Sequence, residues 1–307
     1  MLTVNGTPIA DTFAEAFPMT AARVVVTAAT AEWARTAGRV AAGYACSVIG
    51  CDAEAGIERE LPPAETPDGR PGVSLFFFAF GREKLEKAVV NRVGQCILTC
   101  PTTVCYNGLP VQPDMAIRVG GQLRFFGDGQ QTSKLLDGRR FWRIPVMDGE
   151  FLCEDRFGTT KGVAGGNFLI LATDQATALR AAEAAVAAID GVPGAITPFP
   201  GGIVRSGSKV GSKYKKLRAS TNDAYCPTLR GLGKSELPDG CNAVYEIVID
   251  GLDLPAVEDA TRAGVRAACG PGVLGITAGN YGGKLGPFHL HLHKLVAAQS
   301  PPAAAGE

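Results

Sequence analysis

The chain has 307 residues, 46% of them apolar, and can bury the core of one large domain or of two ordinary ones. Thirty basic residues balance thirty acidic ones, which argues against nucleic acid or a membrane surface as a partner chosen by overall charge. The nine cysteines are odd in number, form no C-x-x-C pair and follow no recognisable signal peptide. We therefore expect reduced thiols, a cytoplasmic location and a soluble protein. The longest apolar run, residues 73–80, is too short to span a bilayer, which takes about 20 residues.

The first half of the chain predicts strands and helices in alternation. DTFAEAF begins at Asp11, and an apolar run then leads to Thr30, the predicted N-cap of a helix that stops at Gly43. The short run CSVIG, before AEAGI, is predicted as a strand followed by a Gly-rich turn. FFFAF predicts the next strand, an amphipathic helix contains Leu85 and Val89, and QCILT predicts a further strand.

The second half repeats this plan. DRFGTTK begins at Asp155, and NFLILATD leads to Asp174, the predicted N-cap of a helix with Gly191 behind it. The short strand AITPF follows, before GGIV. The strand AVYEIVI then leads to a helix that begins at Asp253 and Pro255, and VLGITA predicts the last strand of the plan.

A strand–helix–strand plan that occurs twice in each half predicts an α+β fold of two ferredoxin-like lobes, with mostly antiparallel sheets flanked by helices. Internal duplication would relate the lobes, at residues 1–149 and 150–296. The low-complexity segment 297–307 predicts a disordered tail. A doubly wound Rossmann sheet is the alternative, but no G-x-G-x-x-G opens a helix after a strand.

Eleven phrases along residues 11–286 carry a resemblance to a known family. In order they are DTFAEAF, AEAGI, ETPDGRPGV, RVGQCILT, FFGDG, GVAGGNF, FPGGIV, SKVGSK, STNDAYCPT, VYEIVI and AGNYGGKLG. Together they closely resemble the formylmethanofuran:tetrahydromethanopterin formyltransferases. The resemblance implies two ferredoxin-like lobes and formyl transfer between the amine of a methanofuran-type carrier and a ring nitrogen of tetrahydromethanopterin. Both carriers would be substrates, with no metal and no tightly bound cofactor.

The resemblance also implies partners. Family members form homo-oligomers, so a dimer or tetramer is expected. The archaeal relatives tend to be strongly acidic, whereas this chain is charge-balanced, which favours the bacterial type. A chain of that type would be a subunit of a formyltransferase/hydrolase complex that serves formaldehyde oxidation in methylotrophs.

Glu246, in CNAVYEIVID, is the candidate catalytic residue. Alternation places it on one face of a strand with Val244 and Val248, which would desolvate the carboxyl group and raise its pKa. A buried neutral acid can donate to the oxygen of a tetrahedral intermediate and move a proton between two nitrogens. An exposed glutamate on an edge strand is the alternative from the residues alone. The resemblance favours catalysis, because the family's catalytic glutamate lies in this phrase.

The basic stretch GSKVGSKYKKLRAS looks like half of a phosphate-binding loop but lacks the spacing G-x-x-x-x-G-K-[ST]. Its lysines predict a local positive strip, and its glycines allow a backbone nest for anionic groups. The resemblance implies a carrier tail of glutamyl carboxylates, which would suit this strip. An ordinary solvated basic loop is the alternative. The substrate-binding residues predicted in this stretch are Lys209, Ser212, Lys213 and Lys215.

The phrase STNDAYCPT predicts a second substrate-contact segment, with short polar side chains on a turn fixed by Pro227. Cys226 also invites a covalent mechanism, but a nucleophilic cysteine needs a base, and all three histidines lie at the far end of the sequence. The resemblance implies direct transfer instead. The substrate-binding residues predicted here are Ser220, Thr221, Asn222, Asp223, Tyr225 and Cys226.

The histidines of HLHLH alternate, so His289, His291 and His293 are expected on one face of a terminal strand. Such an arrangement can bind zinc. A solvent-facing edge or a subunit contact is the favoured interpretation, and no metal site is predicted.

Two other functions stay open from the sequence. A scaffold or carrier-binding subunit could keep this fold without catalysis, but the acid at position 246 favours an active enzyme. A formamide hydrolase would need metal-binding histidines and acids that the sequence lacks.

Overall fold

The computed structural model describes residues 1–298, so the predicted tail lies outside the described residues except for its first two. The fold is mixed α/β and divides into two compact units. The inserted unit is Pro18–Gly162. The discontinuous unit is Met1–Phe17 together with the described residues from Val163 onward. This division differs from the predicted lobes at 1–149 and 150–296, which stay a prediction.

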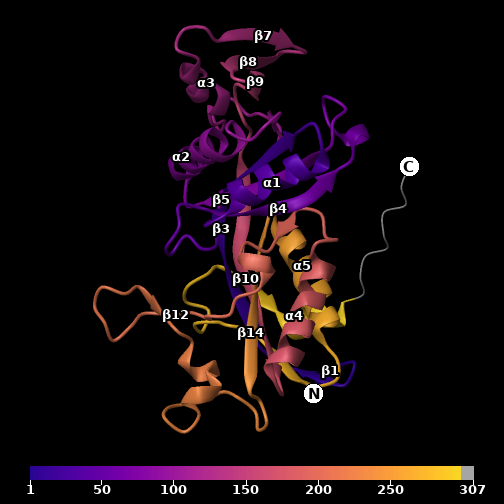
Figure 1. The fold of residues 1–307 in the computed structure, drawn as a ribbon. Helices are drawn as coiled ribbons and strands as arrows, with labels where there is room; N and C mark the ends of the chain where they lie inside the picture. The colour runs from indigo at the N-terminus through magenta and orange to yellow at the C-terminus, as the bar shows by residue number, and fades with distance from the viewer. Residues whose placement is uncertain (299–307) are drawn as a thin grey trace. The chain divides into compact units, whose positions relative to one another are not determined.

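The inserted unit is built around a four-stranded antiparallel sheet with the order β4-β5-β3-β6. Helices α1 and α2 pack on it, and their alanine and leucine side chains share one core with the strands (Figure 1). The chain order is β3 (Phe13–Thr27), α1 (Ala31–Ala42), β4 (Glu54–Leu61), β5 (Gly72–Ala79), α2 (Arg82–Arg92) and β6 (Val104–Asn107).

Three further strands extend this sheet beyond β6. Strand β9 pairs with β6 in parallel, and β8 and β7 follow as antiparallel neighbours. The elements are α3 (Val119–Leu123), β7 (Thr132–Leu136), β8 (Arg139–Val146) and β9 (Gly149–Glu154).

The discontinuous unit repeats the pattern with the antiparallel order β11-β14-β10-β15. Helices α4 and α5 lie side by side on this sheet and bury one common core with it (Figure 1). The chain order is β10 (Thr160–Ala172), α4 (Gln175–Ile189), β11 (Ala195–Ile196), β14 (Ala243–Gly251), α5 (Leu254–Ala268) and β15 (Val273–Thr277).

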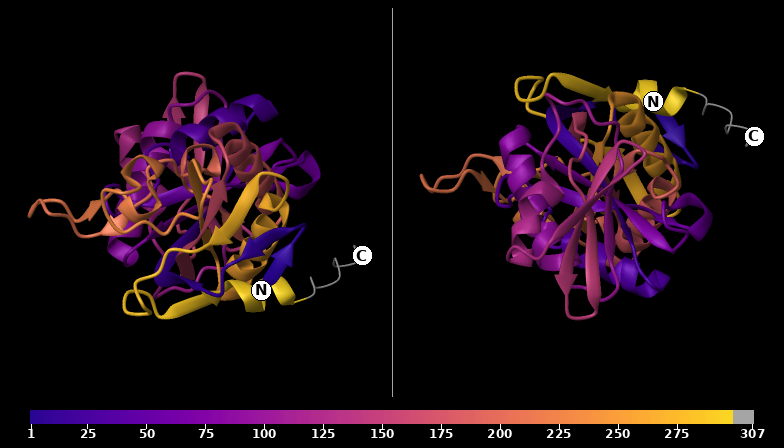
Figure 2. Two further views of the ribbon diagram at one scale, coloured as in Figure 1. Left: turned by 90° about the horizontal axis from the view of Figure 1, so that it is seen from below. Right: turned by 90° about the horizontal axis from the view of Figure 1, so that it is seen from above.

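The two ends of the described chain meet in this unit. Strand β2 pairs with β15 in parallel, and β16 pairs with the start of β3. A separate hairpin, β12–β13, extends away from the strands of its unit in both views of Figure 2. The elements are β1 (Leu2–Val4), β2 (Thr7–Ile9), β12 (Lys209–Val210), β13 (Ala219–Ser220), β16 (Phe288–His291) and α6 (Leu292–Ala297).

The predicted helix starts are confirmed. The side chain of Thr30 accepts a hydrogen bond from the backbone N–H of Trp33, and Asp174 accepts one from Thr177 in the same way. Asp253 caps α5 by the equivalent bond. Such caps satisfy N–H groups that have no partner inside the helix, which is why short polar residues mark these positions in the sequence.

Two predicted strands are wrong. CSVIG forms turns, and the strand instead begins at Glu54, inside the phrase expected to be a turn. QCILT begins in a π-helical turn, Val93–Ile97, that continues from α2, and ends in the turn after it. The fourth strand of the unit comes later, at Val104–Asn107. A short apolar run does not distinguish a strand from a buried helical turn, because burial of Ile97 satisfies both patterns.

Candidate active site

Strand β14 presents Glu246 on the sheet face opposite the helices. Ile247 and Ile249 point the other way, into the core beneath α4 and α5. Glu246 itself is partly buried, and its backbone is paired on both sides, with Leu169 of β10 in register and with Val204 through bonds of 2.8 and 3.1 Å. The predicted alternation is therefore confirmed, and the alternative of an exposed residue on an edge strand is wrong.

The surroundings of Glu246 are largely apolar. On its face of the sheet, Leu169 lies opposite it, and Val244 packs with Leu171 and Leu237 in a small buried cluster. Burial raises the pKa of the Glu246 carboxyl group to about 7. Both protonation states are then populated near neutral pH, which is the condition a group needs to donate and accept a proton in one cycle.

A second carboxylate, Glu15, organises the loop that follows β15. Glu15 is 3% exposed and accepts four backbone N–H groups, those of Tyr281 and Gly283 on Oε1 and those of Leu285 and Gly286 on Oε2, at 2.7 to 2.8 Å. Burial alone would raise the pKa of Glu15, but the four donors outweigh it and hold the pKa below its ordinary value. Glu15 is therefore a permanent anion at neutral pH.

Tyr281 connects this loop to the hairpin. Its hydroxyl oxygen accepts the backbone N–H of Val210 in β12 at 3.0 Å. Burial raises the pKa of Tyr281, and the nearby carboxyl groups of Glu246 and Glu15 raise it further, against the opposing effect of the Val210 N–H. The phenol is thus neutral at physiological pH and lies within the electrostatic reach of Glu246.

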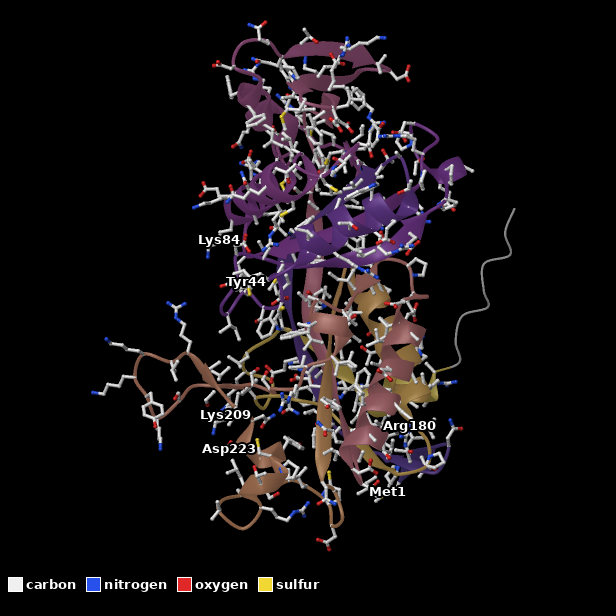
Figure 3. All side chains as sticks on the ribbon, viewed as in Figure 1. Met1, Tyr44, Lys84, Arg180, Lys209 and Asp223 are labelled. Carbon is white, nitrogen blue, oxygen red and sulfur yellow. The ribbon has the colours of Figure 1, made fainter. Side chains whose placement is uncertain are left out.

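The hairpin carries the predicted basic residues at its tip. Lys213 and Lys215 are exposed, and the ammonium group of Lys213 lies 5.2 Å from the ring centre of Tyr214. Ser212 stays close to the backbone, where its Oγ accepts the N–H of Tyr214 at 3.1 Å. Lys209 lies at the base, and its Nζ is 2.7 Å from Oδ1 of Asp223 (Figure 3).

The STNDAYCPT segment follows directly. Ser220 donates to the carbonyl of Gly211, and the Thr221 hydroxyl is 3.4 Å from the sulfur of Cys226. The Cys226 thiol donates to the carbonyl of Asn222 at 3.3 Å. Lys209 holds the pKa of Asp223 below its ordinary value. The structure therefore brings Lys209, Asp223 and the Thr221–Cys226 pair together at the base of the hairpin.

Tyr225 lies elsewhere, on the sheet. Its ring packs on the small cluster around Leu169, and burial raises its pKa, although a hydrogen bond to Thr277 works in the opposite direction. Thr277 faces Leu169, which in turn faces Glu246. Thr277, the hydrogen-bond partner of Tyr225, and Glu246 therefore lie on either side of the same leucine across three strands.

The terminal histidines do not share one strand. His289 and His291 lie on β16 with ring centres 4.8 and 5.3 Å from that of Phe13. His293 lies in α6, where its Nε2 is 2.8 Å from the carbonyl oxygen of Ile9. The prediction of one strand face is wrong, because the chain turns into a helix at Leu292. Across residues 1–298, no three His, Cys, Asp or Glu side chains gather in a way that could hold a metal ion.

A surface recess of about 290 Å³ lies in the inserted unit, lined in part by Phe80, Lys84 and Lys87. It contains none of the predicted site residues, and its two lysines are exposed residues of α2, of which Figure 3 labels Lys84. The chemistry described above is concentrated in the discontinuous unit.

Comparison with known proteins identifies the family. Residues 2–146 match the family model of formylmethanofuran-tetrahydromethanopterin formyltransferase, and residues 149–295 match the model of the proximal lobe of the same enzyme. The chain belongs to this formyltransferase family.

The formyltransferase relatives cover almost the full chain. The chain is 57% identical over 298 residues to the enzyme of this name from Methylococcus capsulatus, with 96% of this chain and 99% of the relative covered. It is 53% identical to a subunit of the formyltransferase/hydrolase complex of Methylorubrum extorquens, with 96% and 97% covered. The solved structure of that complex with methylofuran contains a polypeptide that matches with a TM-score of 0.93 and 52% identity, covering 98% of this chain and 99% of that one.

Three residues of the candidate site were not singled out from the sequence: Glu15, Asn167 and Tyr281. Asn167 accepts the N–H of Gly279 at 2.8 Å and so fixes the start of the loop that carries Tyr281. The phrases DTFAEAF, GVAGGNF and AGNYGGKLG contain these residues, but as family signatures they gave no role. The one physical signal for Glu15 in the sequence is a charged residue between two alanines, Ala14 and Ala16. The structure places both alanines in the core.

Proposed function

We propose that the protein transfers a formyl group between formylmethanofuran, or an analogue of it, and tetrahydromethanopterin, in the oxidation of formaldehyde to formate. The observation that carries the proposal is the burial of Glu246, which raises the pKa of its carboxyl group to about 7. The Tyr281 loop lies within electrostatic range of this group and is bonded to the hairpin. The two carriers are inferred from the names of the relatives, and the acid–base chemistry is inferred from the carboxyl group of Glu246.

Glu246 in its neutral form would serve three steps. Its O–H donates a hydrogen bond to the formyl oxygen as the acceptor nitrogen attacks the formyl carbon, and negative charge collects on that oxygen. When the C–N bond to the donor carrier breaks, the departing nitrogen takes the Glu246 proton. The resulting carboxylate then takes the proton of the newly formylated nitrogen, so that Glu246 ends as it began and no net proton is consumed.

The hairpin and the STNDAYCPT segment would bind the carriers. Lys213 and Lys215 are exposed cations on a projecting strip, which suits a carrier tail that bears carboxylates. Lys209 and Asp223 neutralise each other, so we assign them to shaping the base of the strip. The polar groups that would contact the carriers there are those of Ser212, Ser220, Thr221, Asn222 and Cys226, and Tyr225 would contact them on the neighbouring sheet face.

The strand orders β4-β5-β3-β6 and β11-β14-β10-β15 support two ferredoxin-like lobes, which we propose as the finer description of the fold. We propose that the chain works within a formyltransferase/hydrolase complex, because the Methylorubrum relative is a subunit of such a complex. A homo-oligomeric core within it is a further part of the proposal. No tightly bound cofactor is needed for the steps above.

We propose the cytoplasm as the place of action. All nine cysteines are free thiols, a state that a reducing compartment maintains. Among residues 1–298, no helix combines the length and hydropathy that crossing a bilayer demands.

The purified protein tests the function directly. Mixed with formylmethanofuran and tetrahydromethanopterin, it should produce the formyl-pterin, followed by its absorbance. Glu246→Gln should lower kcat by about two to four orders of magnitude, the range for a lost acid–base group. Glu183→Gln changes an exposed glutamate of α4 and serves as the matched control. Wild-type turnover in the Glu246→Gln variant would remove Glu246 from the mechanism, and an inactive wild type would favour a carrier-binding subunit.

A further inference from the structure

The four N–H groups that converge on Glu15 all come from residues 281–286, more than 260 positions away in the sequence. Glu15 lies in regular, well-packed structure. Its strand pairs with β16, with His289 in register, and its neighbours Ala14 and Ala16 lie in the core. The loop by contrast has little regular structure of its own. Glu15 is therefore the fixed partner and the loop is the part held in place.

The four hydrogen bonds require a carboxylate at position 15. Two oxygens each accept two N–H groups at 2.7 to 2.8 Å, short distances typical of charge-assisted bonds. An amide side chain has one oxygen, and its NH2 group would face two of the donors, leaving buried N–H groups unsatisfied.

The loop is shaped for this contact. A Cβ on Gly286 would lie 2.5 Å from the carbonyl oxygen of Ala16, and Gly283 has φ +75°, a conformation that favours glycine. Asn280 adds a second attachment, because its Nδ2 donates to Thr12 Oγ1 at 3.0 Å and to the carbonyl oxygen of Phe13 at 3.1 Å. The backbone on both sides of Tyr281 is thus tied to one strand.

The side chain of Tyr281 reaches from the loop to the hairpin. Its hydroxyl oxygen accepts the Val210 N–H, and this contact connects the loop to the base of the projecting hairpin. A chain of hydrogen bonds thus runs from Glu15 through the backbone of Tyr281 and its hydroxyl group to Val210 of the hairpin.

We propose that Glu15 is a positioning residue for formyl transfer: its carboxylate fixes residues 281–286, so that Tyr281 secures the hairpin at Val210. The inference rests on the proposed function for its effect on catalysis, but its effect on the hairpin is independent of any activity. Glu15 touches neither carrier in this scheme and acts through Tyr281.

Glu15→Gln is the principal variant. Its first readout is the rate at which trypsin cuts the native protein at Lys213, Lys215 and Lys216, followed by mass spectrometry. We expect this rate to rise at least about tenfold, because local release exposes backbone to protease. The second readout is kcat, expected to fall by about 10- to 100-fold, the cost of a misplaced site.

Glu154→Gln is the matched control. Glu154 is also 3% exposed and accepts from Arg139 and from the N–H of Asn107, but it lies in the inserted unit. This variant should lower the melting temperature by a comparable amount without changing hairpin cleavage or kcat. If it reproduced both effects of Glu15→Gln, general destabilisation would explain them and the proposal would be overturned.

Tyr281→Phe tests the link between the loop and the hairpin while leaving Glu15 unchanged. It provides the test of the proposal if Glu15→Gln does not fold. It removes the acceptor of the Val210 N–H and should raise hairpin cleavage in the same way. An unchanged cleavage rate and kcat in Tyr281→Phe, or in a folded Glu15→Gln, would overturn the inference. If the wild type proved inactive, the proposed function would fail while the cleavage experiment still tested Glu15.

Discussion

Lys209 Nζ lies 2.7 Å from Asp223 Oδ1, so the first lysine of the basic hairpin is already paired within the protein. The exposed positive charge is carried instead by the tip, at Lys213, Lys215, Lys216 and Arg218. A ligand held by charge at this hairpin would meet the tip residues and leave the Lys209–Asp223 pair intact.

Replacing Lys213, Lys215 and Lys216 together by glutamine should raise the KM for the formylated carrier. The kcat should stay near the wild-type value, because tail contacts are equal in the ground state and the transition state. The wild-type KM should also increase with added salt, and the variant's KM less so, because salt screens exposed charges. Steady-state kinetics at two ionic strengths measures both effects.

The control for that experiment changes three exposed lysines of the inserted unit, Lys84, Lys87 and Lys134, to glutamine. It removes the same charge from elsewhere on the chain. An equal rise in KM in both triple variants would show a general charge effect, and no rise in either would leave the hairpin without a role in carrier binding.

The pH dependence of turnover should report Glu246. Because the neutral acid begins the cycle and its pKa is about 7, kcat should fall as the pH rises above about 7. Glu246→Gln should retain a small residual rate without this limb. A wild-type rate that instead fell below pH 7 would mean that the carboxylate is the active form.

The free energy of unfolding should also depend on pH through Glu246, and it should decrease as the pH rises. The folded-state pKa of Glu246, about 7, is raised above the ordinary value of 4.5, so burial stabilises the protonated form relative to the anion. The contribution is present below pH 4.5 and is lost as the pH rises to about 7. The loss is on the order of 3 kcal/mol, from about 1.4 kcal/mol per pKa unit.

Urea denaturation at pH 5 and pH 8 measures this contribution. The free energy of unfolding of Glu246→Gln should decrease less over that interval than that of the wild type, because an amide does not ionise. Equal pH dependence in the two proteins would show that the carboxyl group is solvated enough to titrate normally.

Cys226→Ser and Cys226→Ala should keep substantial activity. The thiol donates to the carbonyl of Asn222 and lies beside the Thr221 hydroxyl, contacts that shape the turn and do not require a thiolate. Mass spectrometry of the enzyme mixed with formylated carrier would decide the point. A formyl adduct on the peptide that contains Cys226 would establish a covalent intermediate and contradict direct transfer.

The sequence predicted those parts of the site that depend on local pattern. The face of Glu246 follows from alternation along β14, and the helix starts at Thr30 and Asp174 follow from capping. The prediction of a strand at QCILT was wrong, because an apolar run of five residues fits a strand and a buried helical turn equally well. Glu15 and Tyr281 could not be placed, because their partners are backbone groups and become neighbours only when distant segments pair.

The pairing of β2 with β15 and of β16 with the start of β3 also determines the order in which the molecule can form during synthesis. Residues 18–162 emerge from the ribosome as one continuous block, whereas Glu15 must wait for donors encoded more than 260 codons later. At about 5–20 residues per second, that delay is on the order of tens of seconds. During this time Glu15 is hydrated and the Tyr281 loop does not yet exist. If Glu15 has the positioning role proposed above, a nascent chain that already contains Glu246 would still lack the contacts that hold the Tyr281 loop.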